Sequence, residues 1–203
     1  MKLYTQKRAP NPRRVHMFLA EKHLDIPTVD FDIMSGEHRT DDLRSMNPAM
    51  TLPVLELDDG TALAESVAIC RYLEELHPEP NLMGRTALKR ATIEMWNRRA
   101  ELLLALPVMF SIRHGVPAFS VLEPEQVPDW SALSRRKALE GMALLNAQLS
   151  RNQFIAGAEF TIADITAFVG IEFGRIIKLA IPEEMPNLAR WRGEVAARPS
   201  ASA

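Results

Sequence analysis

Residues 47–66 read NPAMTLPVLELDDGTALAES, and this stretch decides the architecture of the first part of the chain. Pro53 stands directly before the apolar run at residues 54–57, which has the composition of a short β-strand. Proline has no backbone N–H, so it belongs at the first residue of a strand or on a sheet edge. Its ring also holds Leu52 in extended backbone, and a cis bond between the two would turn the Leu52 amide and carbonyl toward a peptide-like ligand. The pattern is typical of an edge that binds a small molecule.

A turn and a helix follow this strand. Residues 58–60 (Asp-Asp-Gly) are a hairpin-turn signal, and the chain returns through residues 61–64. Glu65 and Ser66 then precede a segment whose apolar residues recur at helical spacing, namely Ile69, Tyr72, Leu73 and Leu76. A helix that opens with a hydroxyl and unpaired amides favours a carboxylate ligand. The alternative is that Ser66 only caps the helix.

Length and composition bound the class of protein. The chain has 203 residues, 47% of them hydrophobic, which suffices for a core in one large domain or two small ones. A net charge of −2 and a pI near 6.2 give no electrostatic argument for binding nucleic acid or an anionic membrane. The N-terminus lacks the apolar core of a signal peptide, and no apolar run approaches the roughly 20 residues of a membrane span, so we expect a cytoplasmic protein. The single cysteine, Cys70, excludes an intramolecular disulfide and a cysteine-based zinc cluster, and its apolar helix predicts a buried, inert thiol.

The chain divides into two styles of patterning. Residues 1–77 alternate short strands with helices in a βαβ-then-ββα order, which indicates a mixed sheet covered by helices. Residues 78–84 begin with the Pro-rich composition of a stiff linker, and residues 85–203 are almost entirely helical in pattern. Within the helical part, Pro107 is expected to kink or interrupt its helix. Residues 161–164 (TIAD) have the form of a capping box at a helix start.

Four features together resemble the cytosolic glutathione transferases over essentially the whole chain. The first is the segment at residues 47–55 that leads into the quoted strand, and the second is the Glu-Ser pair followed by a Tyr-Leu pair, at residues 65–73. The third is the Thr-x-x-Asp box at residues 161–164, and the fourth is the segment from Asn-Leu to Arg-Pro at residues 187–199. The resemblance implies an α/β thioredoxin-like N-terminal domain, an all-α helical C-terminal domain, a cis bond before Pro53 and a homodimer. It also implies glutathione as co-substrate, no metal, and a role in detoxification.

The resemblance further implies how glutathione is held. In the family the backbone before the cis-proline, here Leu52 before Pro53, pairs with the cysteinyl part, while Glu65 and Ser66 hold the γ-glutamyl end. The chemistry agrees, because a hydroxyl at a helix start suits a carboxylate and a side-chain carboxylate suits an ammonium group. His38 aligns with a family position that contacts the glycine carboxylate, and an ordinary surface histidine is the alternative.

The residue that activates the glutathione thiol is expected in the loop at residues 5–12, between the first strand and the first helix. Ala9 stands where serine- or cysteine-using relatives carry their reactive side chain, so their mechanism is absent. Asn11 resembles the asparagine of the nu-type transferases, whose amide lies beside the sulfur, and Thr5 is a second candidate. The alternative is that Asn11 only caps the first helix, with Pro12 as its first residue.

Two further expectations concern a loop and the second substrate. Met50 stands where relatives often have glycine, and methionine disfavours a positive φ, which bears on the loop before Pro53. The resemblance implies a second-substrate wall on the helix that carries Met109, Phe110 and Arg113, where an adaptable apolar surface meets a cation. A Met/Phe stripe at helical spacing is equally compatible with core packing.

The expected activity is conjugation of glutathione to a small electrophile, with the enzyme stabilising the thiolate. A glutathione-dependent disulfide reductase is an alternative, in which the absence of a CxxC motif makes glutathione itself the redox partner. A non-catalytic binding module of the same fold is the other alternative. The chain keeps Asn11, Pro53, Glu65 and Ser66, which favours the enzyme.

Overall fold

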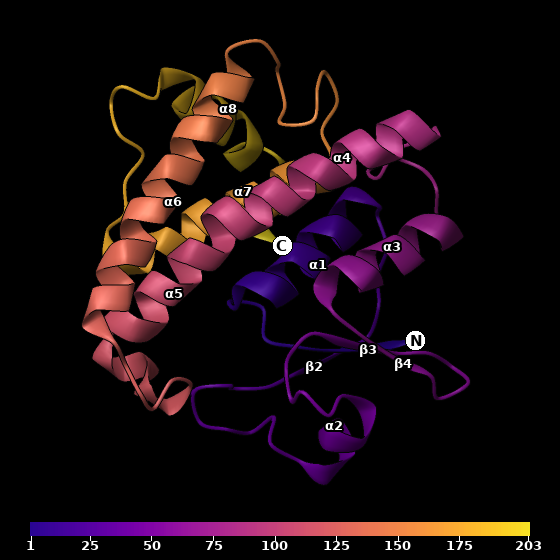
Figure 1. Cartoon of the computed structure of the whole chain (residues 1–203). Coiled ribbons are helices and arrows are strands. Elements are labelled where there is room, and N and C mark those ends of the chain that lie inside the picture. The colour runs from indigo at the N-terminus through magenta and orange to yellow at the C-terminus, as the bar shows by residue number, and fades with distance from the viewer. The chain divides into compact units, whose positions relative to one another are not determined.

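The computed structural model describes residues 1–203 as two compact units (Figure 1). Unit 1 comprises residues 1–81 together with residues 199–203, and unit 2 comprises residues 82–198. The sequence predicted a linker at residues 78–84 and assigned everything after it to the helical domain. The structure differs in that the last five residues pack with unit 1.

The contacts of residues 199–203 explain this difference. They form a short 3-10 helix, η4 (Pro199–Ser202), which packs on α1 (Pro10–Glu21). The guanidinium of Arg13 on α1 donates to the carbonyl of Ala201 at 2.9 Å. Hydrogen bonds between residues so far apart in the sequence leave no local pattern, so periodicity could not predict them.

Unit 1 contains a four-stranded mixed sheet in the order β2-β1-β3-β4. The strands are β1 (Lys2–Thr5), β2 (Thr28–Asp30), β3 (Val54–Glu56) and β4 (Ala62–Ala64). β1 and β2 are parallel, whereas the β1–β3 and β3–β4 pairs are antiparallel. The predicted mixed sheet is therefore confirmed, and Pro53 directly precedes β3, where its missing N–H costs no ladder bond.

Helices α1 and α3 (Ser66–Leu76) lie side by side on one face of this sheet, and α2 (Asp41–Met46) lies on the other side (Figure 1). The core of unit 1 combines fully buried side chains from β1, α1, β3 and α3, namely Leu3, Val15, Phe18, Leu55, Ile69 and Leu73. Cys70 is buried among them, and burial raises the pKa of its thiol to about 12. The predicted buried cysteine is confirmed, and its thiol stays protonated at neutral pH.

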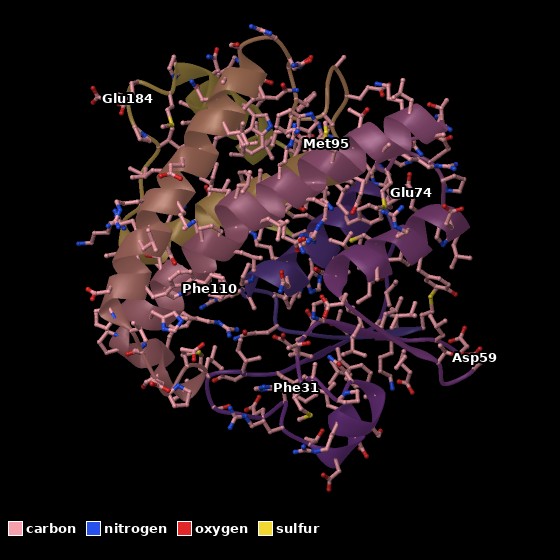
Figure 2. All side chains as sticks on the ribbon, viewed as in Figure 1. Phe31, Asp59, Glu74, Met95, Phe110 and Glu184 are labelled. Atoms are coloured by element: carbon pink, nitrogen blue, oxygen red, sulfur yellow. The ribbon has the colours of Figure 1, made fainter.

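A buried ion pair holds the end of unit 1. The ammonium of Lys22, just after α1, is fully buried and pairs with the carboxylate of Glu74 on α3 (Figure 2 labels Glu74). It also donates to the carbonyls of His77 at 2.6 Å and Pro80 at 2.8 Å, while Asn81 donates to Glu74 at 2.6 Å. A buried cation is tolerated only when it is paired and hydrogen bonded. This cluster ties the segment after α3 to the ends of α1 and α3.

Unit 2 is helical, as predicted. Its α-helices are α4 (Ala87–Ala100), α5 (Leu106–Gly115), α6 (Pro128–Leu149), α7 (Ile162–Gly174) and α8 (Pro186–Ala196). A π-helical segment, η1 (Glu101–Ala105), joins α4 to α5, and 3-10 turns occur at η2 (Pro117–Val121) and η3 (Arg175–Ile177). The helix α7 is apolar on almost every side and is buried along most of its length.

The interruption predicted at Pro107 takes the form of the π-helical segment η1. Pro107 has no N–H to donate to the carbonyl of Leu103 one turn back, and its ring crowds that carbonyl. The helix widens here, and the N–H of Leu106 reaches the carbonyl of Glu101, five residues earlier. Gly141 of α6 packs against the same place, because a Cβ at Gly141 would lie 2.1 Å from the Leu103 oxygen.

The predicted capping box at the start of α7 is present. The buried carboxylate of Asp164 accepts hydrogen bonds from the amide and hydroxyl of Thr161, at 2.9 and 3.1 Å. It also accepts from the Ile155 amide at 2.9 Å and from the indole N–H of Trp191 at 2.8 Å. Burial raises the pKa of Asp164 to about 6, although these four donors act in the opposite direction. One side chain thus joins α7, α8 and the loop between α6 and α7.

No helix in the structure combines the length and the apolar character needed to cross a bilayer.

Candidate functional site

The loop before β3 is shaped by its own side chains. Asn47 donates through its amide to the carbonyl of Thr51 at 2.9 Å and accepts from the amide of Ala49 at 3.2 Å, so it closes the loop from inside. Met50 adopts a φ of +53°, a value that methionine disfavours. The closed loop therefore imposes a left-handed conformation that its residue type disfavours.

The loop leads to a cis bond between Leu52 and Pro53, as predicted. Neither the amide nor the carbonyl of Leu52 is hydrogen bonded within the chain, and the Leu52 side chain is half-buried. Backbone groups of this kind form a short edge that can pair with another extended chain. Leu52 thus has the backbone geometry that a peptide-like ligand requires.

The start of α3 is the second element of the site. Glu65 precedes the helix with a φ of +66°, an unusual value for a residue with a side chain, and Ser66 is the first residue of α3. No side chain caps this helix, so the amides of its first turn have no intrahelical partner. The alternative that Ser66 only caps α3 is therefore wrong, because the capping position belongs to Glu65. An uncapped helix start attracts an anion.

The Ser66 hydroxyl is held by a residue that the sequence analysis did not single out. Arg14 of α1 is only 3% exposed and donates through Nη1 to Ser66 Oγ at 2.6 Å. The same nitrogen donates to Oδ1 of Asn11 at 3.4 Å, a longer and weaker contact. An arginine at the helical spacing of the buried residues Val15 and Phe18 was the available signal, since arginine is almost never buried without partners.

The loop at residues 5–12 places the thiol candidates in different surroundings. Helix α1 begins at Pro10 with Ala9 as its N-cap, so Asn11 lies inside the first turn and its side chain is exposed. The alternative that Asn11 caps this helix is wrong. The hydroxyl of Thr5 is buried and lies 2.8 Å from Nε2 of His16. Burial, with Lys7 second, lowers the pKa of His16, which keeps that imidazole neutral.

His38 lies in the turn that follows Gly36 and is only 6% exposed, so it is not the surface histidine of the alternative interpretation. Its Nδ1 atom is buried without a hydrogen-bond partner. Burial, with Arg39 second, lowers the pKa of His38, so the ring is neutral at physiological pH. A buried polar atom without a partner is rare in folded proteins and indicates a site for a ligand or a water molecule.

The predicted second-substrate residues lie on α5 of unit 2. Met109, Phe110 and Arg113 are each half-buried (Figure 2 marks Phe110). The ring of Phe110 packs against His114 and Trp130, with ring centroids 6.5 and 6.0 Å apart. Phe110 therefore belongs to an aromatic cluster between α5 and α6 that is only partly covered.

The comparisons with known proteins identify the family. Residues 9–76 match the family profile described as "Glutathione S-transferase, N-terminal domain", and residues 117–199 match "Glutathione S-transferase, C-terminal domain". The chain is 38% identical over 203 residues to "Glutathione S-transferase 2" of Saccharomyces cerevisiae, covering 98% of this chain and 87% of the yeast protein. The chain belongs to the glutathione S-transferase family.

Solved structures of transferase relatives agree with this fold. The crystal structure of a glutathione S-transferase domain-containing protein from Marinobacter aquaeolei VT8 has a TM-score of 0.95 and 44% identity, and covers 98% of this chain and 99% of that one. The crystal structure of Gtt2 from Saccharomyces cerevisiae has a TM-score of 0.94 and 38% identity, with 100% and 99% covered. The expected thioredoxin-like α/β domain followed by a helical domain is therefore confirmed.

Hydrogen bonds and unpaired polar groups connect the candidate site residues of unit 1 as follows. Asn11, Arg14 and Ser66 are joined through one guanidinium nitrogen, while the Leu52 backbone and the His38 ring contribute separate unpaired polar groups. No group of three or more His, Cys, Asp or Glu side chains is arranged to hold a metal ion.

Proposed function

We propose that this glutathione S-transferase binds glutathione on unit 1 and stabilises its thiolate for transfer to a small electrophile. The observation that carries the proposal is the start of α3, where an uncapped helix terminus meets a buried hydroxyl that Arg14 holds in place. Such a terminus favours a carboxylate through the helix dipole and its free amides. The γ-glutamyl end of glutathione carries both a carboxylate and an ammonium group, and the exposed Glu65 suits the ammonium.

The rest of the tripeptide would extend along the loop before β3. The free amide and carbonyl of Leu52, fixed next to Pro53, suit the backbone of the cysteinyl residue. The unpartnered Nδ1 of the neutral His38 ring suits the glycine end, where an imidazole N–H can donate to a carboxylate. Both carboxylates, the ammonium group and the cysteinyl backbone of glutathione thus have a candidate partner within unit 1.

Asn11 is the proposed partner of the glutathione sulfur. A free thiol has a pKa of about 8.5, and lowering it by two units requires about 2.7 kcal/mol of preferential stabilisation of the thiolate. The Oδ1 atom of Asn11 accepts from Arg14, which leaves the amide N–H₂ to donate to sulfur, as in the nu-type transferases. Thr5 is the weaker candidate, because its buried hydroxyl already faces His16.

The second substrate would lie against Met109, Phe110 and Arg113. The partly covered aromatic cluster around Phe110 suits an apolar, planar electrophile, and Arg113 suits an anionic substituent on it. Replacing Phe110 with Ala is expected to raise the KM for such an electrophile while leaving the affinity for glutathione unchanged.

We also expect a homodimer. Leu88, Met95 and Leu102 are spaced seven residues apart along α4 and η1 and are 77%, 41% and 46% exposed (Figure 2 marks Met95). An exposed apolar stripe at this spacing is typical of a helix that packs on another chain. Sedimentation velocity tests this expectation, and Met95→Lys should shift the protein toward the monomer.

Isothermal titration with reduced and oxidised glutathione tests the proposal. Ser66→Ala should weaken binding of reduced glutathione about tenfold, which is the loss of one hydrogen bond to a charged group. Ser150→Ala, at an exposed serine of unit 2, serves as the control and should bind like the wild type. A wild-type protein that binds neither form of glutathione would refute the transferase proposal in favour of a non-catalytic module.

Activity assays separate the remaining alternatives. Turnover of a chloronitrobenzene supports conjugation, and Asn11→Ala should lower its rate and raise the pH at which the rate reaches half its maximum. Turnover dominated by a hydroxyethyl disulfide, with oxidised glutathione bound more tightly, would identify a disulfide reductase instead. In that case glutathione itself is the redox partner, since burial raises the pKa of the only cysteine, Cys70, to about 12.

A further inference from the structure

Arg14 is the buried cation that lies behind the candidate glutathione site. It occupies the second turn of α1, and its side chain is almost fully covered by protein. A guanidinium has no acceptor atom and donates in a fixed planar arrangement. Any oxygen that is hydrogen bonded to Arg14 must therefore be the acceptor in that bond. This holds even for a hydroxyl oxygen, which can elsewhere act as a donor.

Because Arg14 can only donate, its hydrogen bonds fix the orientation of the Ser66 hydroxyl and of the Asn11 amide. Because Ser66 Oγ accepts from Arg14 at 2.6 Å, the hydroxyl proton of Ser66 is left to point elsewhere, toward the uncapped start of α3. Because Asn11 presents Oδ1 to the same nitrogen at 3.4 Å, the amide N–H₂ of Asn11 is the outer end of its side chain. The Ser66 hydroxyl and the exposed Asn11 amide each keep a hydrogen that the bond to Arg14 does not use, and an anionic ligand can accept a hydrogen bond from it.

We propose that Arg14 is a positioning residue that orients Ser66 as a donor to the γ-glutamyl carboxylate and Asn11 as a donor to the glutathione thiolate. This inference rests on the proposed glutathione site and adds to it the residue that makes the two ends of the site act together. Arg14 does not touch glutathione in this arrangement. The shorter bond to Ser66 makes the effect on the carboxylate end the larger of the two.

The charge of Arg14 acts in the same direction as its geometry. Arg14 opposes the effect of burial on the pKa of Cys70, so its positive potential reaches the interior beside α3. A cation in a poorly solvated place stabilises nearby anions more than a surface cation does. Lys7 and Arg8, in the loop before α1, are exposed and largely screened by water.

The experiment compares three variants by two measurements. Replacing a residue that has only a structural role would leave both measurements unchanged. The variants are Arg14→Met, Arg14→Lys and Lys22→Met, the last removing another buried cation beside α1 that lies outside the site. The first readout is the Kd of S-methylglutathione, which has the carboxylate ends but no thiol. The second is the pKa of the thiol of bound glutathione, measured from the ultraviolet absorbance of the thiolate.

We expect Arg14→Met to raise the Kd of S-methylglutathione about tenfold or more and to move the pKa of the bound thiol toward that of the free thiol. Arg14→Lys keeps a buried positive charge but loses the planar guanidinium. Compared with Arg14→Met, it should therefore bring the pKa of the bound thiol part of the way back to the wild-type value, but leave the Kd of S-methylglutathione raised. Lys22→Met should lower the melting temperature and leave both readouts at their wild-type values.

Double variants assign each effect to its partner. On a Ser66→Ala background, Arg14→Lys should no longer change the Kd, and on an Asn11→Ala background it should no longer change the thiol pKa. Additive effects in these cycles, or wild-type values of both readouts in Arg14→Met and Arg14→Lys, would overturn the inference. Where Arg14→Met does not fold, the Arg14→Lys cycles alone decide the outcome. Loss of glutathione binding by the wild type would instead refute the proposed function itself, so the two failures are distinguishable.

Discussion

Replacing Gly141 with Ala tests how α6 is fitted against the π-helical segment of unit 2. The added Cβ would lie 2.1 Å from the backbone oxygen of Leu103, 2.8 Å from its carbonyl carbon and 3.3 Å from the Cα of Leu104. Two of these three atoms lie closer than side-chain Cβ atoms normally approach, and all three belong to backbone that cannot turn aside. The substitution therefore forces α6 and η1 apart by roughly 1 Å.

The expected cost follows from two opposing terms. Overpacking of a close-packed interior costs about 1–3 kcal/mol, and occasionally more, and backbone contacts at 2.1 Å place Gly141→Ala at the upper end of that range. Alanine offsets about 1 kcal/mol of this cost through its better helix propensity. We therefore expect Gly141→Ala to lower the free energy of unfolding by about 2 kcal/mol or more.

The chain offers a matched control in Gly193, which lies inside α8 with no atom within 4 Å of a Cβ placed there. Gly193→Ala should gain about 1 kcal/mol from helix propensity alone. The two variants should thus differ by about 3 kcal/mol, which corresponds to about 6–12 °C in melting temperature for a chain of this size. Thermal and urea unfolding measure this difference. Equal stabilities for the two variants would refute the packing argument, because propensity would then account for both.

Three further predictions concern buried charges. Lys22→Met should lower the free energy of unfolding by about 3–5 kcal/mol, because it removes the cation that is paired with the buried carboxylate of Glu74. The double variant Lys22→Met with Glu74→Leu should recover most of that loss in urea unfolding. Burial raises the pKa of Asp164 to about 6 from 3.8, so the folded state holds the proton more tightly than the unfolded chain does. The free energy of unfolding of the wild type relative to Asp164→Asn should therefore rise as the pH falls from about 6 to about 3.8. A stability difference that does not change with pH would contradict this. Burial and, to a smaller extent, the charge of Lys7 lower the pKa of His16 from 6.5, so the unfolded chain takes up the proton first. The wild type should therefore lose stability relative to His16→Gln as the pH falls below 6.5. Chemical unfolding at several pH values in this range measures the loss.

Some features of the fold and of the site could be predicted from the sequence because they depend on covalent geometry or on residues close in the chain. Pro53 is confined to the start of a strand by its missing N–H, and the structure places it directly before β3. The capping box of Thr161 and Asp164 involves residues three apart, and it forms as expected. The burial of Cys70 follows from its position in an apolar helix. Each of these depends on short-range rules that any part of the chain obeys.

Other features required the folded chain. The propensity of Met50 argued against a positive φ, yet the bonds that Asn47 makes within the loop hold it there. Asn11 fitted a capping position by residue type, but α1 begins at Pro10 and leaves it inside the first turn. The hydrogen bond between Arg14 and Ser66 could not be predicted, because the two residues lie 52 positions apart in the sequence.

The sequence by itself therefore determined the order of the elements, the division into an α/β part and a helical part, the strand that begins after Pro53 and the helix that begins at Ser66. Periodicity and backbone restrictions encode these locally. Only the tertiary structure decided which groups of the stretch at residues 47–66 remain free for a ligand and which are already bonded. Packing α1 beside α3 brings Arg14 to Ser66, so that Ser66 Oγ accepts a hydrogen bond from a residue that no local pattern places near it.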